Sequence, residues 1–168
     1  MARAQLLEAG ITADQVHERL RRGALISVFR GTYPVGHAAP SQLATYMAAV
    51  LTCGEGALLR GRSAGHLERL LKRAPACPEV LTTTERRIRG IRTTRARAGI
   101  DPRDLTGVRG IPVTTVPRTL VDLAAVLDEE ALALACHNAG AIYRPTPAQV
   151  DAVLARRPNA PGVRKLQA

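Results

Sequence analysis

The chain opens with MARAQLLEAGITADQVHERLRRGALISVFRGTYPVG, residues 1–36, and this stretch carries the densest series of local structural signals. Residues 2–9 and 13–22 have the spacing of apolar side chains that is typical of amphipathic helices. Over residues 25–35 the hydrophobic period changes to two, with a bend in the middle, which indicates a β-hairpin. Helix, tight turn, helix and hairpin in this order predict a winged helix-turn-helix.

Cap and turn residues support the two helices. Gly10 and Gly23 follow the helical runs, at the position where a helix end needs a left-handed residue. Thr12 and Gln15 have the spacing of a capping box, in which each side chain bonds the backbone N–H of the other residue. Winged helix-turn-helix domains have three helices, and only two precede the hairpin here. We therefore expect a partly truncated unit, with the first helix missing, over residues 1–36.

The second helix would enter the major groove of DNA. Gln and Arg are the residue types that contact base edges and phosphates, and this helix directs several of them outward. The candidate DNA-binding residues in this unit are Gln15, Arg19, Arg21 and Arg22 on the helix and Arg30 at the tip of the hairpin. A capped amphipathic helix with a solvated polar face explains the same pattern, because any two short helices mimic this geometry.

The charge of the chain favours a polyanionic partner. Lys and Arg number 24 and Asp and Glu 14, so the net charge is +10. Residues 60–109 hold thirteen basic and five acidic side chains, which places +8 of this excess in the centre of the chain. We expect a phosphate-binding surface made of Arg86, Arg87, Arg89, Arg92 and Arg95. The alternative is a compositional preference for arginine that leaves only a solvated face.

Residues 37–168 predict an α+β domain with a small mixed or antiparallel sheet, packed helices and a basic central segment. Period-two patterns place strands at residues 80–83 and 91–95. Residues 105–109 and 111–114 are interpreted as further short strands or as an extended crossing. Cap residues place helix starts at Ser41, Ser63, Thr114 or Thr115, Asp128 and Thr146. The helix after residue 115 carries an apolar stripe made of Leu120, Leu123, Ala124 and Leu127.

Motifs of enzyme chemistry are lacking. The sequence contains no P-loop, no G-x-G-x-x-G, no H-E-x-x-H and no G-x-S-x-G. The four histidines have no metal-ligand spacing, and Asp122, one helical turn after Arg118, is interpreted as its structural ion-pair partner. We therefore predict a protein that is not an enzyme, without catalytic residues, metal or cofactor.

The cysteines and the hydropathy indicate the compartment. Cys53, Cys77 and Cys136 are odd in number and lack C-x-x-C spacing, so we expect reduced, partly buried thiols. No signal peptide and no apolar run of membrane-spanning length is present. These features predict a cytoplasmic protein without a membrane partner.

Residues 110–124, GIPVTTVPRTLVDLA, carry the most specific motif of the chain. They resemble the segment G-[IL]-P-V-T-x-x-x-R-T-L-x-D-L-A of actinobacterial proteins of the AbiEi antitoxin family. The match extends to Gln5-Leu6-Leu7, to Arg30-Gly31-Thr32-Tyr33 and to Arg62-Ser63-Ala64. The resemblance covers nearly the whole chain.

The resemblance implies an N-terminal winged helix that binds promoter DNA, followed by an antitoxin domain. Such type IV antitoxins repress their own operon and counter a nucleotidyltransferase-like toxin without forming a tight complex. Many relatives carry a third part, a very-short-patch-repair-like endonuclease domain, which this sequence does not contain. Two functions follow: a DNA-binding regulator or antitoxin, and a non-catalytic N-terminal part or remnant of an endonuclease-like protein that binds nucleic acid.

Overall fold

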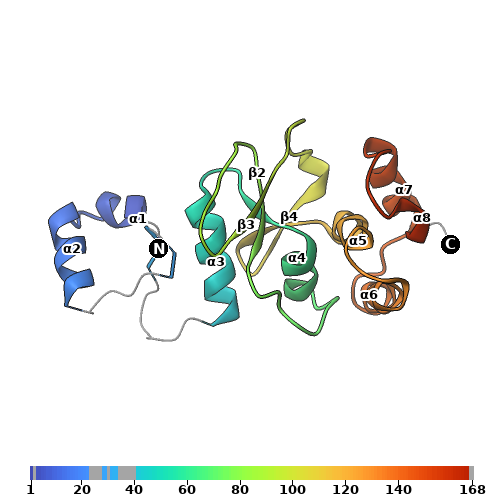
Figure 1. Ribbon diagram of the computed structural model, residues 1–168, viewed down its shortest axis with the longest axis horizontal. Helices are drawn as coiled ribbons and strands as arrows, with labels where there is room; N and C mark the ends of the chain where they lie inside the picture. Colours follow the sequence, from blue (N-terminus) through green and yellow to red (C-terminus); the bar gives the residue numbers. More distant parts are fainter. Residues whose placement is uncertain (2, 23–27, 30, 34–40, 167–168) are drawn as a thin grey trace.

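The computed structural model describes residues 1, 3–22, 28–29, 31–33 and 41–166. Its fold is α+β, as the sequence predicts. The helices are α1 (Arg3–Glu8), α2 (Ala13–Arg21), α3 (Gln42–Cys53), α4 (Gly61–Leu67), the short 3₁₀ helix η1 (Pro102–Asp104), α5 (Val116–Ala124), α6 (Glu129–Ile142), α7 (Pro147–Arg156) and α8 (Val163–Leu166). The strands are β1 (Leu58–Leu59), β2 (Glu79–Thr82), β3 (Arg92–Arg95), β4 (Leu105–Val108) and β5 (Ile111–Thr114). Figure 1 shows an elongated molecule, with α1 and α2 at one end, the sheet in the middle and α6 to α8 at the other end.

The five described strands form one mixed sheet in the order β3-β2-β1-β5-β4. Its centre is β1, which pairs antiparallel to β2 and parallel to β5. The sequence patterns did not predict β1, because two residues are too short for a period to be seen. Leu58 and Leu59 are nevertheless almost completely buried, at 1% and 0% exposed.

Strands β2 and β3 run parallel, with Glu79 opposite Arg92 and Thr82 opposite Arg95. A bend of nine residues between two strands would ordinarily suggest a hairpin, since parallel strands need a longer crossover. Here the chain returns to the start of β2, where the Arg92 N–H donates to the Pro78 carbonyl at 2.8 Å. Residues 83–91 therefore carry the chain back along the length of β2 to its start, without pairing with β2 as an antiparallel ladder.

Strands β4 and β5 pair antiparallel as a hairpin, so the alternative of short strands holds for these residues and the extended crossing does not. The two turn residues of the hairpin, Arg109 and Gly110, have φ of 52° and 76°. Two consecutive left-handed residues define a type I′ turn, which matches the twist of antiparallel strands. Residues 105–108 and 111–114 thus pair in the register that the turn dictates.

Two large apolar clusters form most of the core of the described residues. The first packs α3 and α4 against the sheet and is centred on Tyr46, Leu59 and Val113. The second joins α5 to α6 and contains the whole predicted stripe of α5, from Leu120 to Leu127. The amphipathic period of α5 was therefore a reliable guide to its buried face.

Helix caps account for most of the predicted helix starts. The side chains of Thr12, Ser41, Asp128 and Thr146 each accept a bond from the third residue of their helix. The prediction for Ser63 was wrong, because α4 begins after Arg60 and places Ser63 inside the helix. Ser63 is fully buried, and its hydroxyl accepts from the Glu79 N–H at 2.8 Å, so it joins α4 to β2.

The N-terminal helices follow the prediction as far as they are described. Gly10 has φ of 83°, and Thr12 and Gln15 form the expected capping box. Val16 is buried together with Leu6 and Tyr33. Gly23, most of the hairpin strands and Arg30 lie outside the described residues, where the neighbouring Phe29 and Thr32 form a single bridge. The two-helix turn is present, and the winged helix-turn-helix remains a prediction.

The described cysteines are all free, as expected. Cys53 is buried and Cys136 is partly buried, but Cys77 is exposed, which corrects the expectation for that residue. Within the described ranges, no helix combines the length and the apolar character needed to cross a membrane.

A substitution at Gly162 tests how tightly the segment between α7 and α8 packs on α5. Its φ is 81°, and a Cβ at this position would overlap the carbonyl oxygen of Ala124. Gly162→Ala is expected to lower the free energy of unfolding by about 1–3 kcal/mol, the range of overpacked sites, in urea titrations. Gly99→Ala is the matched control, since Gly99 has φ of 79° and open space around it. Equal losses in the two variants would contradict tight packing at Gly162.

Candidate nucleic-acid interface

The loop between β2 and β3, residues 83–91, holds three of the predicted arginines and is anchored by two isoleucines. Ile88 and Ile91 form a bridge around the turn Arg89-Gly90. Ile91 is buried and Ile88 packs on the first apolar cluster. With Ile88 directed inward, its neighbours Arg87 and Arg89 are exposed. The arginines are therefore presented by a loop that is fixed to the core.

Polar contacts fix the first half of the same loop. The Thr93 hydroxyl of β3 donates to the Arg86 carbonyl. A Cβ on Gly54 would lie 3.3 Å from Nη2 of Arg86, so this guanidinium lies against the C-cap of α3. A cation is stabilised there because the carbonyl end of a helix carries partial negative charge. Arg86 thus has a structural contact in addition to its place on the predicted surface.

Most arginines of this segment carry uncompensated charge. Arg86, Arg87, Arg89, Arg92, Arg95 and Arg97 are all exposed. Arg87 pairs loosely with Glu85 at 3.7 Å, and Arg92 with Glu79 at 3.4 Å, while the others form no ion pair with a described residue. Exposed pairs of this kind contribute little, about 0–1 kcal/mol. Their guanidinium groups are therefore available to an anionic partner.

The arginines surround two hollows, one on each side of the loop. The first, about 640 Å³, lies between the loop and Phe29. The second, about 460 Å³, lies between the loop and β3 and is lined by Arg87, Arg95 and Arg97 among others. Arg97 was not among the predicted site residues. Its signal was present, since residues two apart in an extended chain share a face and Arg95 was predicted.

The predicted residues on α2 are exposed but partly engaged. Gln15 accepts from the Thr12 N–H through its side-chain oxygen at 3.1 Å. Arg21 and Arg22 both pair with Glu18, and all of these contacts are at the surface. The pairs are weak, and Gln15, Arg19 and Arg22 share one face because they lie four and three residues apart.

The structure does not bring the two groups of predicted residues into one site. Figure 1 shows α2 at the N-terminal end, with α3 between it and strands β2 and β3. Phe29, which follows α2 in the chain, contacts the loop between β2 and β3: its ring would lie 3.3 Å from a Cβ on Gly90. Arg30, beside Phe29 in the sequence, lies outside the described residues. A nucleic acid that contacts both groups would therefore have to extend along the molecule.

The strongest charge cluster is buried and lies elsewhere. Arg118 is 2% exposed and donates to Asp104 at 2.7 Å and to Asp122 at 3.2 Å. Arg60 bonds Asp122 at 3.1 Å, and Arg156 bonds Asp104. The predicted pair of Arg118 and Asp122 is therefore confirmed as part of a larger ion network. The sequence did not reveal the other members, which come from β1–α4, η1 and α7.

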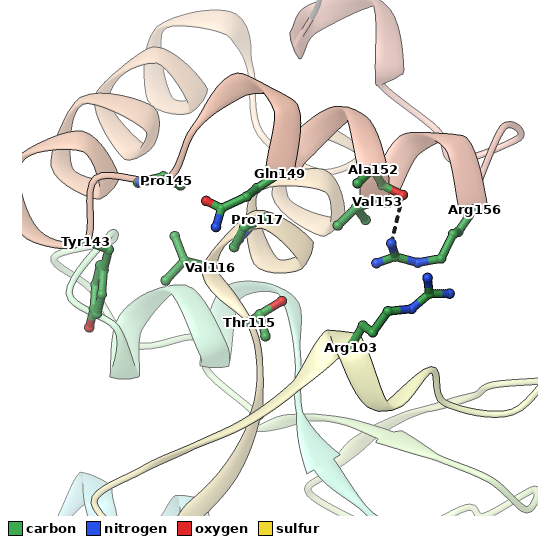
Figure 2. A pocket seen from close by; sticks show the side chains of 10 residues that line it. All are labelled: Arg103, Thr115, Val116, Pro117, Tyr143, Pro145, Gln149, Ala152, Val153 and Arg156. Atoms are coloured by element: carbon green, nitrogen blue, oxygen red, sulfur yellow. Dashed lines mark hydrogen bonds between the residues drawn. The ribbon is translucent and has the colours of Figure 1, made fainter.

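A pocket of about 370 Å³ borders this network between α5 and α7. Figure 2 shows Arg103 and Arg156 at one end of it and Tyr143 at the other. Both guanidiniums are engaged with carboxylates, since Arg103 bonds Asp101 at 2.7 Å and Arg156 bonds Asp104. Hydrogen bonding to Arg103 holds the pKa of Asp101 well below its usual range. These arginines stabilise the fold, and the pocket is a weaker candidate for an anion than the loop.

Glu68, which follows α4, is the second unusual buried group. It is 0% exposed, and neither of its oxygens accepts a well-formed hydrogen bond from the described residues. Burial raises the pKa of Glu68 to about 8, and the neighbouring Thr119 hydroxyl offsets part of that rise. The carboxyl group is therefore mostly protonated at neutral pH.

Comparison with known proteins adds no assignment: neither a family model nor a curated protein matches this sequence. The function must therefore be argued from the residues and their geometry.

Proposed function

We propose that this protein is a DNA-binding transcriptional regulator, the antitoxin of a type IV toxin–antitoxin-like system. In this proposal it binds its own promoter through α2 and through the arginines of residues 86–95. It acts in the cytoplasm, without a catalytic step or a cofactor, and counters a nucleotidyltransferase-like toxin without a tight complex. The resemblance of residues 110–124 to the AbiEi family suggested the system, and the surface charge supports the mode of binding.

The observation that carries the proposal is the set of exposed, unpaired arginines on a fixed loop. Arg89 and Arg95 are exposed and form no ion pair with a described residue. Guanidinium groups bind phosphate oxygens with two parallel hydrogen bonds, which suits them to a DNA backbone. Because the isoleucine anchors hold the loop, little conformational entropy is lost when it binds.

An edge-strand explanation competes with this one. Strand β3 is at the end of the sheet, and charged side chains on an edge strand prevent pairing with other molecules. That role would account for Arg92 and Arg95. It does not account for Arg87 and Arg89, which lie on the loop and outside any strand. We therefore favour a binding surface.

The test is binding of the full chain to its own upstream DNA and to a scrambled duplex, by fluorescence anisotropy at two salt concentrations. We expect preference for the upstream duplex at the higher salt, since base contacts survive where phosphate contacts weaken. The variant R89E/R95E is expected to lose affinity by more than about tenfold and to bind with a shallower salt dependence. The control R73E/R164E makes the same change of charge at exposed residues outside the interface.

Two results would contradict the proposal that this protein is a promoter-binding regulator. Equal and steeply salt-dependent binding to both duplexes would favour the second function, a nucleic-acid-binding part of an endonuclease-like protein, because phosphate contacts alone do not read sequence. Equal losses in R89E/R95E and R73E/R164E would show that only net charge matters.

A further inference from the structure

The hollow between the loop and β3 has the features of a small-anion site. Its volume of about 460 Å³ falls within the range of small-molecule pockets, about 300–1,000 Å³. Arg87 lines it from the loop, and Arg95 and Arg97 line it from the edge strand and its continuation. The Ala96 N–H donates to the Thr82 carbonyl at 2.8 Å, which keeps the chain extended between Arg95 and Arg97.

The charge of the hollow exceeds what one phosphodiester would neutralise. The described residues that line it include four arginines and one carboxylate, Glu85, so their formal net charge is +3. One of the four, Arg86, also has its guanidinium against the C-cap of α3. Glu85 is 67% exposed and reaches Arg87 only at 3.7 Å, so it compensates little. A ligand with three or more negative charges in a small volume would complement this site better than a single backbone phosphate.

We infer that this hollow binds a polyphosphate group through Arg87, Arg95 and Arg97. The hydroxyl of Thr94 borders the same hollow and supplies a further donor. None of the described residues that line the hollow is aromatic, so they offer a nucleobase no stacking partner. The site therefore recognises the phosphate chain, and a nucleoside attached to it is expected to add little affinity.

This inference does not depend on the promoter binding proposed above, although the two share Arg87 and Arg95. Polyphosphate chemistry has two sources, a free nucleoside triphosphate and the phosphorylated end of a nucleic acid. Both present the same group to the arginines, and the experiment distinguishes them.

The test is isothermal titration of the full chain with sodium tripolyphosphate, orthophosphate and adenosine triphosphate. We expect one tripolyphosphate per chain, similar affinity for the triphosphate within about threefold, and binding of orthophosphate that is weaker by about tenfold or more. Arg97→Gln and Arg95→Gln are each expected to weaken tripolyphosphate binding by about tenfold. Arg73→Gln, which changes an exposed arginine elsewhere, is expected to have no effect.

Three outcomes would overturn the inference: no tripolyphosphate binding, binding that Arg97→Gln leaves unchanged, or an equal loss in Arg73→Gln. Exposed Arg→Gln changes usually alter stability by less than about 0.5 kcal/mol, so loss of folding is not a concern. An oligonucleotide with a 5′-triphosphate that competes more strongly than its hydroxyl-ended form would assign the site to nucleic-acid ends. Equal competition would assign it to the free anion.

The failures of the two proposals are distinguishable. A protein that binds tripolyphosphate through Arg97 but ignores its own promoter would retain this site and lose the proposed function. A protein that prefers its promoter but does not bind tripolyphosphate would support the proposed function and contradict the polyphosphate site.

Discussion

Replacing Arg118 with alanine is expected to destabilise the protein by about 3–5 kcal/mol, enough to unfold much of a small domain. The reason is that the Arg118 guanidinium neutralises two buried carboxylates. The side chains of Asp104 and Asp122 are only 3% and 4% exposed, and Arg118 bonds both. Removing the cation leaves two buried carboxylates whose remaining partners, Arg60 and Arg156, are only partly buried, so about half of the compensating charge at the centre of the network is lost.

The measurement is the midpoint and slope of urea unfolding for wild type and variant. Arg103→Ala is the matched control, because its partner Asp101 is close but the Arg103 side chain is 71% exposed. That change is expected to lower the free energy of unfolding far less, because an exposed ion pair contributes little to stability. If Arg118→Ala lost no more than Arg103→Ala, the network would not be the buried cross-link that its geometry indicates.

Such a cross-link matters for the interface because of the elements that it joins. Arg118 and Asp122 lie on α5, Asp104 ends η1, and Arg156 ends α7. The same η1 leads into β4, at the opposite edge of the sheet from the arginine-bearing β3. We therefore expect Arg118→Ala to reduce nucleic-acid binding only in proportion to the unfolded fraction.

Replacing Glu68 with glutamine is expected to change how stability depends on pH. Folding raises the pKa of this carboxyl from about 4.5 to about 8. Between these values the folded protein keeps a proton that the unfolded chain releases, so wild-type stability decreases as pH rises. The slope is at most about 1.4 kcal/mol per pH unit, and it disappears above the folded pKa.

Glu68→Gln removes this dependence because glutamine does not titrate in that range. The stability difference between variant and wild type should therefore grow from pH 5 to pH 8, by a few kcal/mol in total. The buried amide of glutamine has its own desolvation cost, but that cost is constant with pH. The slope is thus the diagnostic quantity, measured by urea unfolding at intervals of one pH unit.

Glu55→Gln is the control, since it removes one carboxylate at an exposed position. Parallel stability curves for Glu68→Gln and wild type would show that Glu68 is hydrated or paired in solution.

The sequence was most informative where structure depends on neighbours in the chain. The capping boxes at Thr12 and Thr146 and the apolar stripe of α5 follow from contacts within a few residues. For the interface, the arginine-rich composition of residues 86–95 alone indicated an exposed basic segment. That these residues bind DNA is still a prediction, as is the winged helix over residues 1–36.

Tertiary structure decided the features that depend on distant parts of the chain. The burial of β1, the parallel pairing of β2 with β3 and the contact of Ser63 with Glu79 all required packing that no local period encodes. The ion network joins side chains as far apart as Arg60 and Asp122, and a charge reveals its partner in sequence only when the two lie within a helical turn. The spacing of residues in the sequence therefore determined the helix caps and the apolar face of α5. Burial and charge pairing were decided by the tertiary fold, because burial and the strength of an ion pair depend on which surfaces of the folded protein exclude water.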